Sequence, residues 1–450
     1  MAVSTEDLGT EDIRKLLIRQ AVPASVGILF MTVNILVDTI FVGRWIGPLA
    51  IAALTVVTPI AFLIASIGLA IGVGGSSVLS RALGEGDVEK AHRAFAHQIM
   101  MTFILASVLV TVGLLFTDEV LTLFGAKGKI LAPAKEFFYP ILLAAPLQAL
   151  CSMGNTVIRA EDKAKFAMLS LIIPSIANIL LDVLFIKVFN LGIFGAALAT
   201  ALSFLFCFLY VGWFFVFRSE LRMKLHYFKV QLGLVKEISA LSSTTLSRQG
   251  VISILSVLLN NTLFAHGGEN SVTIYGIISK MLMFALFPVN GIAEGFAPVS
   301  AFNYGAKNFE RVRRTIKIAI TYAGGIAIII YAVILIFAEQ IVTVFTDDAA
   351  IIKGTPNALR WVFAASPVIA VQLIGSAYFQ SAGKALKALL LTLTKQGFFL
   401  IPLILILPNY FGIFGVWVSF PIADVLATLV TGIFLRKEMT HKLKETDGVL

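Results

Sequence analysis

Two aspartates inside otherwise apolar segments are the residues of this sequence best suited to chemistry. Asp38 lies four positions after Asn34, and Asp182 lies four positions after Asn178, a spacing that places each pair on one helix face. Thr200, in a third apolar segment, adds a hydroxyl. Together these side chains form an oxygen-rich cluster suited to a hard cation such as sodium, or to a proton when one carboxyl is protonated. The sequence therefore predicts a cation-coupling site.

The cost of burying charge supports this interpretation. A carboxylate near the centre of a membrane span costs about 2.5–3.5 kcal/mol on insertion scales, so it normally faces a cavity or a partner. The alternative is that Asp38 and Asp182 lie at the outer membrane surface, because both are near the ends of their segments. Asn34, Asn178 and Thr200 taken singly are more typical of hydrogen bonds between helices.

The segments that carry these residues belong to an internal repeat. Many residues of the first half reappear about 221 positions later, which indicates two related halves facing a shared space. The matched pairs include Gly84 and Gly305, Glu89 and Glu310, Pro146 and Pro367, Gly154 and Gly375, and Lys163 and Lys384. Asp38 and Asp182 are matched by Leu259 and Leu403, so only the first half has the acidic site.

Composition indicates an integral membrane protein. With 58% hydrophobic and 14% charged residues and a mean hydropathy of +0.93, the apolar surface must be solvated by lipid. Windows of about 20 apolar residues predict twelve spans. They cover 16–42, 49–78, 94–116, 137–157, 166–187, 193–217, 239–265, 272–301, 315–338, 358–380, 386–407 and 412–435. These long runs predict an all-α bundle with six helices per half and not a β-barrel.

The domain organisation follows from these spans. We expect an N-terminal lobe over 1–216, a cytoplasmic amphipathic linker over 217–238 and a C-terminal lobe over 239–450. No soluble domain fits, and we expect a monomer surrounded by lipid. Cys151 and Cys207 fall inside spans without metal-ligand spacing, which argues against a disulfide framework or a zinc site.

The net charge of +9 reports topology and not nucleic-acid binding. Basic residues gather in alternate loops, so the positive-inside bias places both termini and the linker in the cytoplasm. Those loops contain Arg81, Lys90, Arg93, Arg159, Lys163, Lys165, Arg218, Arg222, Lys224, Lys229, Lys236, Lys307, Arg311, Arg313, Arg314, Lys384 and Lys387. No removable signal peptide is apparent in the first 15 residues.

Glu294 is the candidate for substrate selection in the second half. Gly291 and Gly295 flank it and would leave room beside it, and a carboxylate near aromatic surface suits a lipophilic cation. The further candidates for substrate contact are Phe284, Phe287, Phe296 and Gln249. An alternative role for Glu294 is an ion pair with Lys280. Asp424 has no obvious partner, and we expect it at the membrane interface.

Pro23 is a candidate hinge. It interrupts the first span about four turns before Asp38, and a bend there would couple the acidic site to movement of that helix.

The motifs together resemble the bacterial multidrug and toxic compound extrusion (MATE) family. The resemblance rests on Pro23 and the Asp38 motif, on Asn178-x3-Asp182 followed by Gly195-Ala-Ala-Leu-Ala-Thr200, and on the run from Pro288 to Asn308. It implies two six-helix lobes in a V shape and extrusion of organic cations driven by sodium or protons. In members with an acidic first lobe, the cation site involves residues matching Asp38, Asn178, Asp182 and Thr200.

One departure from the family pattern is informative. Some members use acidic residues in the seventh and tenth helices. The corresponding spans of this chain contain no Asp or Glu and offer only amide side chains in their place. These are Gln249, Asn260, Asn261, Gln372 and Gln380. The departure favours the first-lobe mechanism over a second-lobe sodium site.

We therefore expect an antiporter with alternating access in the bacterial cytoplasmic (inner) membrane, with proton coupling preferred to sodium and no cofactor. A flippase for lipid-linked precursors is the alternative, because Arg248, Lys280 and Lys395 lie inside spans and would suit an anionic headgroup. An enzyme is not expected, since the sequence has no P-loop lysine motif, HExxH or GxSxG.

Overall fold

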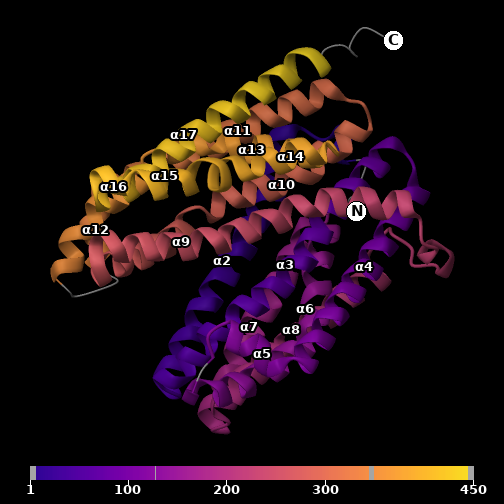
Figure 1. Cartoon of the computed structure of the whole chain (residues 1–450). Helices are drawn as coiled ribbons and strands as arrows, with labels where there is room; N and C mark the ends of the chain where they lie inside the picture. The colour runs from indigo at the N-terminus through magenta and orange to yellow at the C-terminus, as the bar shows by residue number, and fades with distance from the viewer. Residues whose placement is uncertain (1–6, 127, 344–348, 444–450) are drawn as a thin grey trace. The chain divides into compact units, whose positions relative to one another are not determined.

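The computed structural model describes residues 7–126, 128–343 and 349–443, and the regular structure in these ranges is entirely helical (Figure 1). The helices of the first half are α1 (Asp7–Thr10), α2 (Ile13–Trp45), α3 (Pro48–Glu85), α4 (Val88–Leu115), α5 (Thr117–Leu123), α6 (Leu131–Ala160), α7 (Ala164–Asp182) and α8 (Gly192–Phe217). Those of the second half are α9 (Leu232–Ala285), α10 (Phe287–Gly305), α11 (Phe309–Thr343), α12 (Ala349–Val362), α13 (Ile369–Ser381), α14 (Ala385–Leu393), α15 (Ile401–Ile406), α16 (Pro408–Phe411) and α17 (Ile413–Lys437).

Short segments of tighter or wider helix join these elements. Turns of 3₁₀ helix cover Gly128–Ile130, Leu225–Phe228 and Ser366–Val368. Segments of π-helix cover Val183–Val188, Thr394–Leu400 and Glu438–Lys442. A π-helical segment widens the turn locally and is frequent at functional sites. Two of the three continue helices that carry buried ionisable residues.

The prediction of an all-α membrane protein is confirmed. Eleven helices of the described residues are long and apolar enough to cross a membrane. One of them, α9, is 54 residues long and breaks at Gly268, whose φ of 66° is strained for any residue with a side chain. The break separates the predicted seventh span from the start of the eighth, and α10 completes the eighth. The apolar runs form helices because only helices and closed barrels satisfy the backbone in lipid.

Two compact units divide the chain, and α2 is shared between them. The first unit contains Val26–Leu246, and the second contains Leu8–Ser25 together with Ser247–Leu450. These boundaries differ from the predicted lobes, because the first 13 residues of α2 pack with the second half of the chain. The predicted lobe boundaries rest on sequence position, whereas the units follow packing.

An apolar core of the first unit is formed mainly by α3, α6 and α8 (Figure 1). Gly68 brings α3 very close to α6, because a Cβ there would lie 2.2 Å from the carbonyl oxygen of Ala149. Val57, Ile64, Phe138 and Leu142 fill the adjoining interior. Close packing through small residues is the usual way in which membrane helices associate.

The second unit is built around α13, which contacts α10, α11 and α17 (Figure 1). Its core includes Phe296, Tyr378 and Phe379, all fully buried. The start of α2 joins this unit through the two glycines of α10. A Cβ at Gly291 would lie 2.0 Å from the Ser25 hydroxyl oxygen, and one at Gly295 would lie 2.8 Å from the Ala21 nitrogen.

The linker is shorter than the interval 217–238, because α9 begins at Leu232. It packs on the first unit by specific polar contacts. The Gln231 amide donates to His97 Nε2 at 3.0 Å, and Tyr227 meets the edge of His92 with ring centroids 5.0 Å apart. Glu161 accepts hydrogen bonds from the Ser219 hydroxyl at 2.7 Å and the Leu221 amide at 3.0 Å.

Candidate functional site

Asp38 and Asp182 meet inside the first unit. Asp38 lies on α2, and Asp182 is the last residue of α7, directly before the π-helical segment Val183–Val188. Asp182 is fully buried and Asp38 is partly buried. Their carboxyl groups are close enough for a side-chain hydrogen bond and for their charges to repel. The structure therefore brings the two predicted carboxylates together.

No hydrogen-bond donor reaches these carboxylates from the rest of the described chain. Oδ1 of Asp38 and both oxygens of Asp182 are buried, and none of them has a hydrogen-bond donor among the described residues. An ionised carboxylate only accepts hydrogen bonds, so a bond between the two aspartates requires that one of them be protonated. Two like charges cannot both persist in such an environment. A proton or another cation must therefore accompany this pair.

The amide and hydroxyl residues form a chain of hydrogen bonds beside the carboxyls. Asn34 Nδ2 donates to Asn178 Oδ1 at 2.7 Å, and Asn178 Nδ2 donates to Thr200 Oγ1 at 3.3 Å. Thr200 in turn donates to the carbonyl oxygen of Ala196 at 3.1 Å. The chain links α2, α7 and α8 and holds each amide one helical turn from an aspartate. All five predicted cation-coupling residues lie in this region of the first unit.

Pro23 lies inside α2 without ending it. Proline removes one backbone hydrogen bond from the helix. Two residues later, the Ser25 hydroxyl donates to the Ala21 carbonyl at 2.9 Å, an arrangement that often bends helices. The boundary between the two compact units also falls at Ser25. The proline, the hydrogen bond of the Ser25 side chain and the boundary between the units thus lie next to one another on α2.

Glu294 lies on α10 and is partly buried. Its charge acts on Arg248 of α9, which is likewise partly buried and belongs to the second unit. Lys280 is exposed, and within the described ranges it forms no ion pair. Arg248, and not Lys280, is therefore the cation associated with Glu294. Gln249 follows Arg248 on α9 and is partly buried.

The expected aromatic wall is only partly present. Phe284 and Phe287 are partly buried, but Phe296 is fully buried in the core with Leu17 and Tyr378. The expectation that Phe296 lines a cavity is therefore wrong for this structure. The expectation that Gly291 and Gly295 leave open room is wrong as well, because the start of α2 occupies that space. On a helix, spacing alone does not say which face meets a neighbour.

The second unit also contains a buried ion pair that sequence reasoning missed. Lys395 Nζ lies 2.6 Å from Asp424 Oδ1, and the Asp424 side chain is only 5% exposed. The expectation that Asp424 has no partner is therefore wrong. A signal existed, since Lys395 and Asp424 lie at similar distances on either side of the turn between the last two spans, which places them at one depth.

Comparison with known proteins agrees with this arrangement. The profile of the MatE family matches residues 23–184 and 249–406. The multidrug export protein MepA of Staphylococcus aureus is 25% identical over 435 residues, covering 96% of each chain. A solved structure described as the outward-facing conformation of a multidrug resistance MATE family transporter of the MOP superfamily superimposes with a TM-score of 0.94 at 28% identity, covering 99% of this chain and 100% of the other.

A second solved structure is of special interest. It is a MOP superfamily transporter from Pyrococcus furiosus, described as having a reversed polarity of its binding pocket that suggests a different function. It has a TM-score of 0.92 and 28% identity, with 99% of this chain and 100% of that chain covered. Proteins with this fold thus differ in the charge of their pockets.

Proposed function

The chain belongs to the MatE family, and on this premise we propose that it is a secondary active multidrug exporter that exchanges organic cations for protons. The family consists of transporters, so the prediction that the protein is not an enzyme is confirmed. Transporters of this kind need no cofactor, because the coupling ion is cargo. Relatives and solved structures described as multidrug transporters support the export of drugs.

The observation that carries the proposal is the uncompensated pair of carboxyls in the first unit. Asp38, partly buried, and Asp182, fully buried, lie together, and among the described residues neither a hydrogen-bond donor nor a basic residue balances them. Such a pair binds a cation strongly and changes its surroundings when the cation leaves. Those are the properties that an ion-coupling site requires.

A proton fits this geometry better than sodium. Asn178 Oδ1 and Thr200 Oγ1 already accept hydrogen bonds, so these oxygens are engaged and not directed at a common ion. Each oxygen keeps one further lone pair, so a sodium ion would have only part of their coordinating capacity, whereas a proton can sit between the two aspartates as they stand. We therefore favour proton coupling. In the less favoured alternative, the coupling ion is sodium and its ligands are Asp38, Asn178, Asp182 and Thr200.

The transport cycle follows from two states with different ligand preferences. Protonation of the Asp38 and Asp182 pair removes its charge and favours one packing of the first unit, and drug binding favours the other. α2 connects this pair to the second unit, because its residues from Val26 onward belong to the first unit. Pro23 lies just before that boundary, and we assign the bending of α2 to it.

We assign drug recognition to the region around Glu294, including Phe284, Phe287 and Gln249. A partly buried carboxylate attracts a lipophilic cation by charge, and the two phenylalanine rings offer cation–π contact. Arg248 sets a condition on this role, since the drug must compete with the guanidinium for Glu294. Flat organic cations with delocalised charge are suited to that exchange because they are weakly hydrated.

The basic residues of alternate loops support a bacterial inner-membrane location with both termini in the cytoplasm. A single chain contains both units, and a monomer suffices for the cycle.

A flippase for lipid-linked anionic precursors is the second candidate. Arg248 favours it, because a partly buried guanidinium suits a phosphate headgroup, and the transporter described as having a reversed pocket polarity that suggests a different function supports it. However, Glu294 accompanies Arg248, and Asp424 neutralises Lys395. An anionic headgroup would have to displace these carboxylates.

Efflux of a fluorescent organic cation from proteoliposomes tests the proposal. We expect export with an imposed pH gradient and none with a sodium gradient at equal, clamped pH. Sodium-driven export that persists with a protonophore would overturn the choice of proton. No export in either regime, with translocation of a fluorescent lipid intact, would favour the flippase.

A further inference from the structure

A basic hollow lies at one end of the second unit, away from the buried residues considered above. It has a volume of about 570 Å³. Its cationic lining residues are Arg313, Arg314, Lys317 and Arg436, and its apolar lining residues include Val371, Leu435 and Met439. The lining comes from α11, from α13 and from the end of α17 with the π-helical segment after it. α13 contacts both α11 and α17 and so forms the floor between them.

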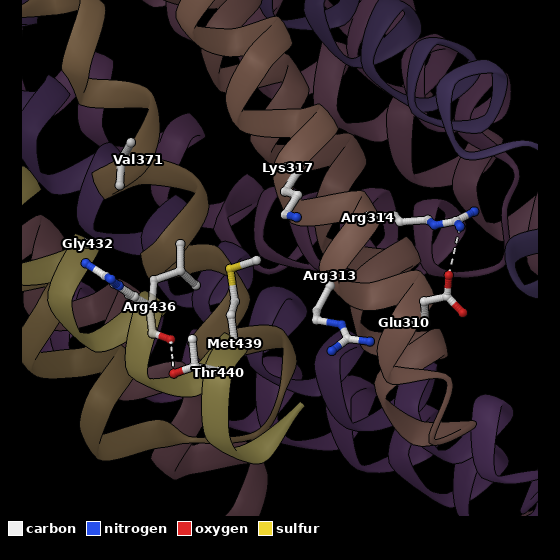
Figure 2. Close-up of a pocket in the computed structure, with 10 residues that line it drawn as sticks. Glu310, Arg313, Arg314, Lys317, Val371, Gly432, Arg436, Met439 and Thr440 are labelled. Carbon is white, nitrogen blue, oxygen red and sulfur yellow. Dashed lines mark hydrogen bonds and ion pairs between the residues drawn. The ribbon is translucent and has the colours of Figure 1, made fainter. Parts of the chain in front are cut away.

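Two of these cations face the same space. Arg313 and Lys317 are four residues apart, which places them on one side of α11. Figure 2 shows both on the side toward Met439, whereas Arg314 turns to the other side, where it pairs with Glu310 at 2.8 Å. In the part of the chain that the structure describes, the Lys317 ammonium forms no ion pair or hydrogen bond. Neighbouring like charges on a helix destabilise each other, so an anion between them is favoured.

The hollow lies where two membrane spans meet their polar ends. After Lys317, α11 continues without a charged residue until Glu339. α17 is likewise uncharged from Val425 to Leu435, and Arg436 follows in its last turn. The cations are therefore at the depth of lipid headgroups, on the side where basic loops gather.

The surface beside the cations is apolar and suited to acyl chains. Leu429 and Ile433 on α17 are 58% and 67% exposed, about two turns and one turn inward from Arg436, respectively. Val371 and Met439 extend this surface into the hollow. A soluble anion would use only the cations, whereas a lipid would use both surfaces. Basic pockets between helices on the cytoplasmic side are typical binding sites for anionic lipid headgroups.

We propose that this hollow binds a phospholipid with an anionic headgroup. The phosphate lies between Arg313 and Lys317, and an acyl chain follows Met439 and Val371 toward Ile433. Arg436 adds positive charge at the rim, and Figure 2 shows its guanidinium turned outward from the hollow. The bound lipid would join the ends of α11 and α17 over α13. The site is independent of the Asp38 and Asp182 pair and of any drug that the protein exports.

Binding of acyl-labelled fluorescent phosphatidylglycerol to the purified full-length protein in neutral detergent tests this site. We expect unlabelled phosphatidylglycerol to compete, phosphatidylcholine to compete at least about tenfold more weakly, and glycerol phosphate not to compete. Each cation near an anionic headgroup strengthens binding about fivefold, so Lys317→Gln should weaken it about fivefold and Arg313→Gln/Lys317→Gln about 25-fold.

The matched control is Lys437→Gln/Lys442→Gln, which removes two charges at the same end of the unit but outside the lining. It should change the affinity less than about twofold. An equal loss in this control would assign the binding to general surface charge and overturn the proposal. Equal competition by phosphatidylcholine, or by glycerol phosphate, would overturn it in favour of a purely apolar groove or a free-phosphate site. If the double variant does not fold, Lys317→Gln alone provides the test, because it changes a single exposed side chain.

Discussion

The two units bury their ionisable residues in opposite ways. In the first unit, Asp38 and Asp182 approach each other, and no described residue supplies a basic partner. In the second unit, Asp424 is held by Lys395 at 2.6 Å, and Arg248 accompanies Glu294. The halves share a repeat but not a charge arrangement. An uncompensated acid pair must take its cation from outside, whereas a compensated pair needs none.

This difference assigns the two units separate tasks. A buried ion pair is neutral as a whole, so its contribution is to packing and not to ion exchange. A pair of acids instead alternates between a state with a cation and a state without one. We therefore infer that ion exchange resides in the first unit. The predictions below test this division, from the largest expected effect to the smallest.

Asp38→Asn and Asp182→Asn should each abolish gradient-driven export, because each removes one of the two titrating carboxyls. The loss in transport rate should be at least about tenfold, which corresponds to about 1.4 kcal/mol or more. Efflux from proteoliposomes with equal amounts of protein measures it. Export at the parent rate by both variants would contradict the assignment of ion exchange to this pair.

Lys395→Met should destabilise the protein without a specific effect on ion exchange. It leaves Asp424 buried without a partner, which costs about 3–5 kcal/mol of unfolding free energy. Lys395→Met/Asp424→Leu should recover most of that loss and export at close to the parent rate. The melting temperature of the purified variants and their efflux rates measure both effects. Loss of export by a stable double variant would place ion exchange in the second unit too.

The two halves also differ in a loop, where Glu161 of the first half has Ala382 at its repeat position in the second half. Burial raises the pKa of Glu161 to about 7 from its ordinary value of 4.5, although hydrogen bonds from Ser219 and Leu221 oppose that rise. The folded state therefore holds this proton more tightly than the unfolded state. Its contribution is full below pH 4.5 and is lost as pH rises through about 7.

The melting temperature should consequently fall between pH 5 and 8, by an amount equivalent to about 1–3 kcal/mol. Glu161→Gln should flatten this part of the profile because it removes the titrating group. Glu119 is exposed and is not among the groups that shift the pKa of Glu161, so Glu119→Gln should leave the slope in place and serves as control. An unchanged slope in Glu161→Gln would exclude Glu161 as its source.

Glu294→Gln should weaken export of cationic drugs by severalfold, and of dications more than monocations, while sparing neutral substrates. The expected loss of interaction free energy with the drug is that of a cation–π or exposed charge contact, about 0.5–2 kcal/mol. Resistance to a monocation, a dication and a neutral compound measures it. If Glu294 serves only to hold Arg248, the variant should lose all substrates together and melt at a lower temperature.

Sequence reasoning predicted the acidic site because its signals are local. Spacings of four residues place Asn34 beside Asp38 and Asn178 beside Asp182. The repeat shows that the counterparts of the two aspartates are leucines. The all-α membrane fold likewise follows from long apolar runs, each of which must form a helix to satisfy its own backbone.

Features that depend on contacts between helices were harder to predict. The partner of Asp424 lies on another helix, and Phe296 turned inward because of how α10 rotates against its neighbours. Gly291 and Gly295 indicated close approach, but not that α2 makes it. The division of α2 between the two units also arises only from packing.

Proton release on drug binding tests the central claim most directly. Purified protein in weakly buffered detergent should release protons when an organic cation is added, because drug binding favours the ionised state of the Asp38 and Asp182 pair. The Asp38→Asn/Asp182→Asn variant should bind the drug and release none, and Lys395→Met/Asp424→Leu should release as many protons as the parent. Undiminished release by the Asp38→Asn/Asp182→Asn variant would contradict the assignment of ion exchange to the first unit.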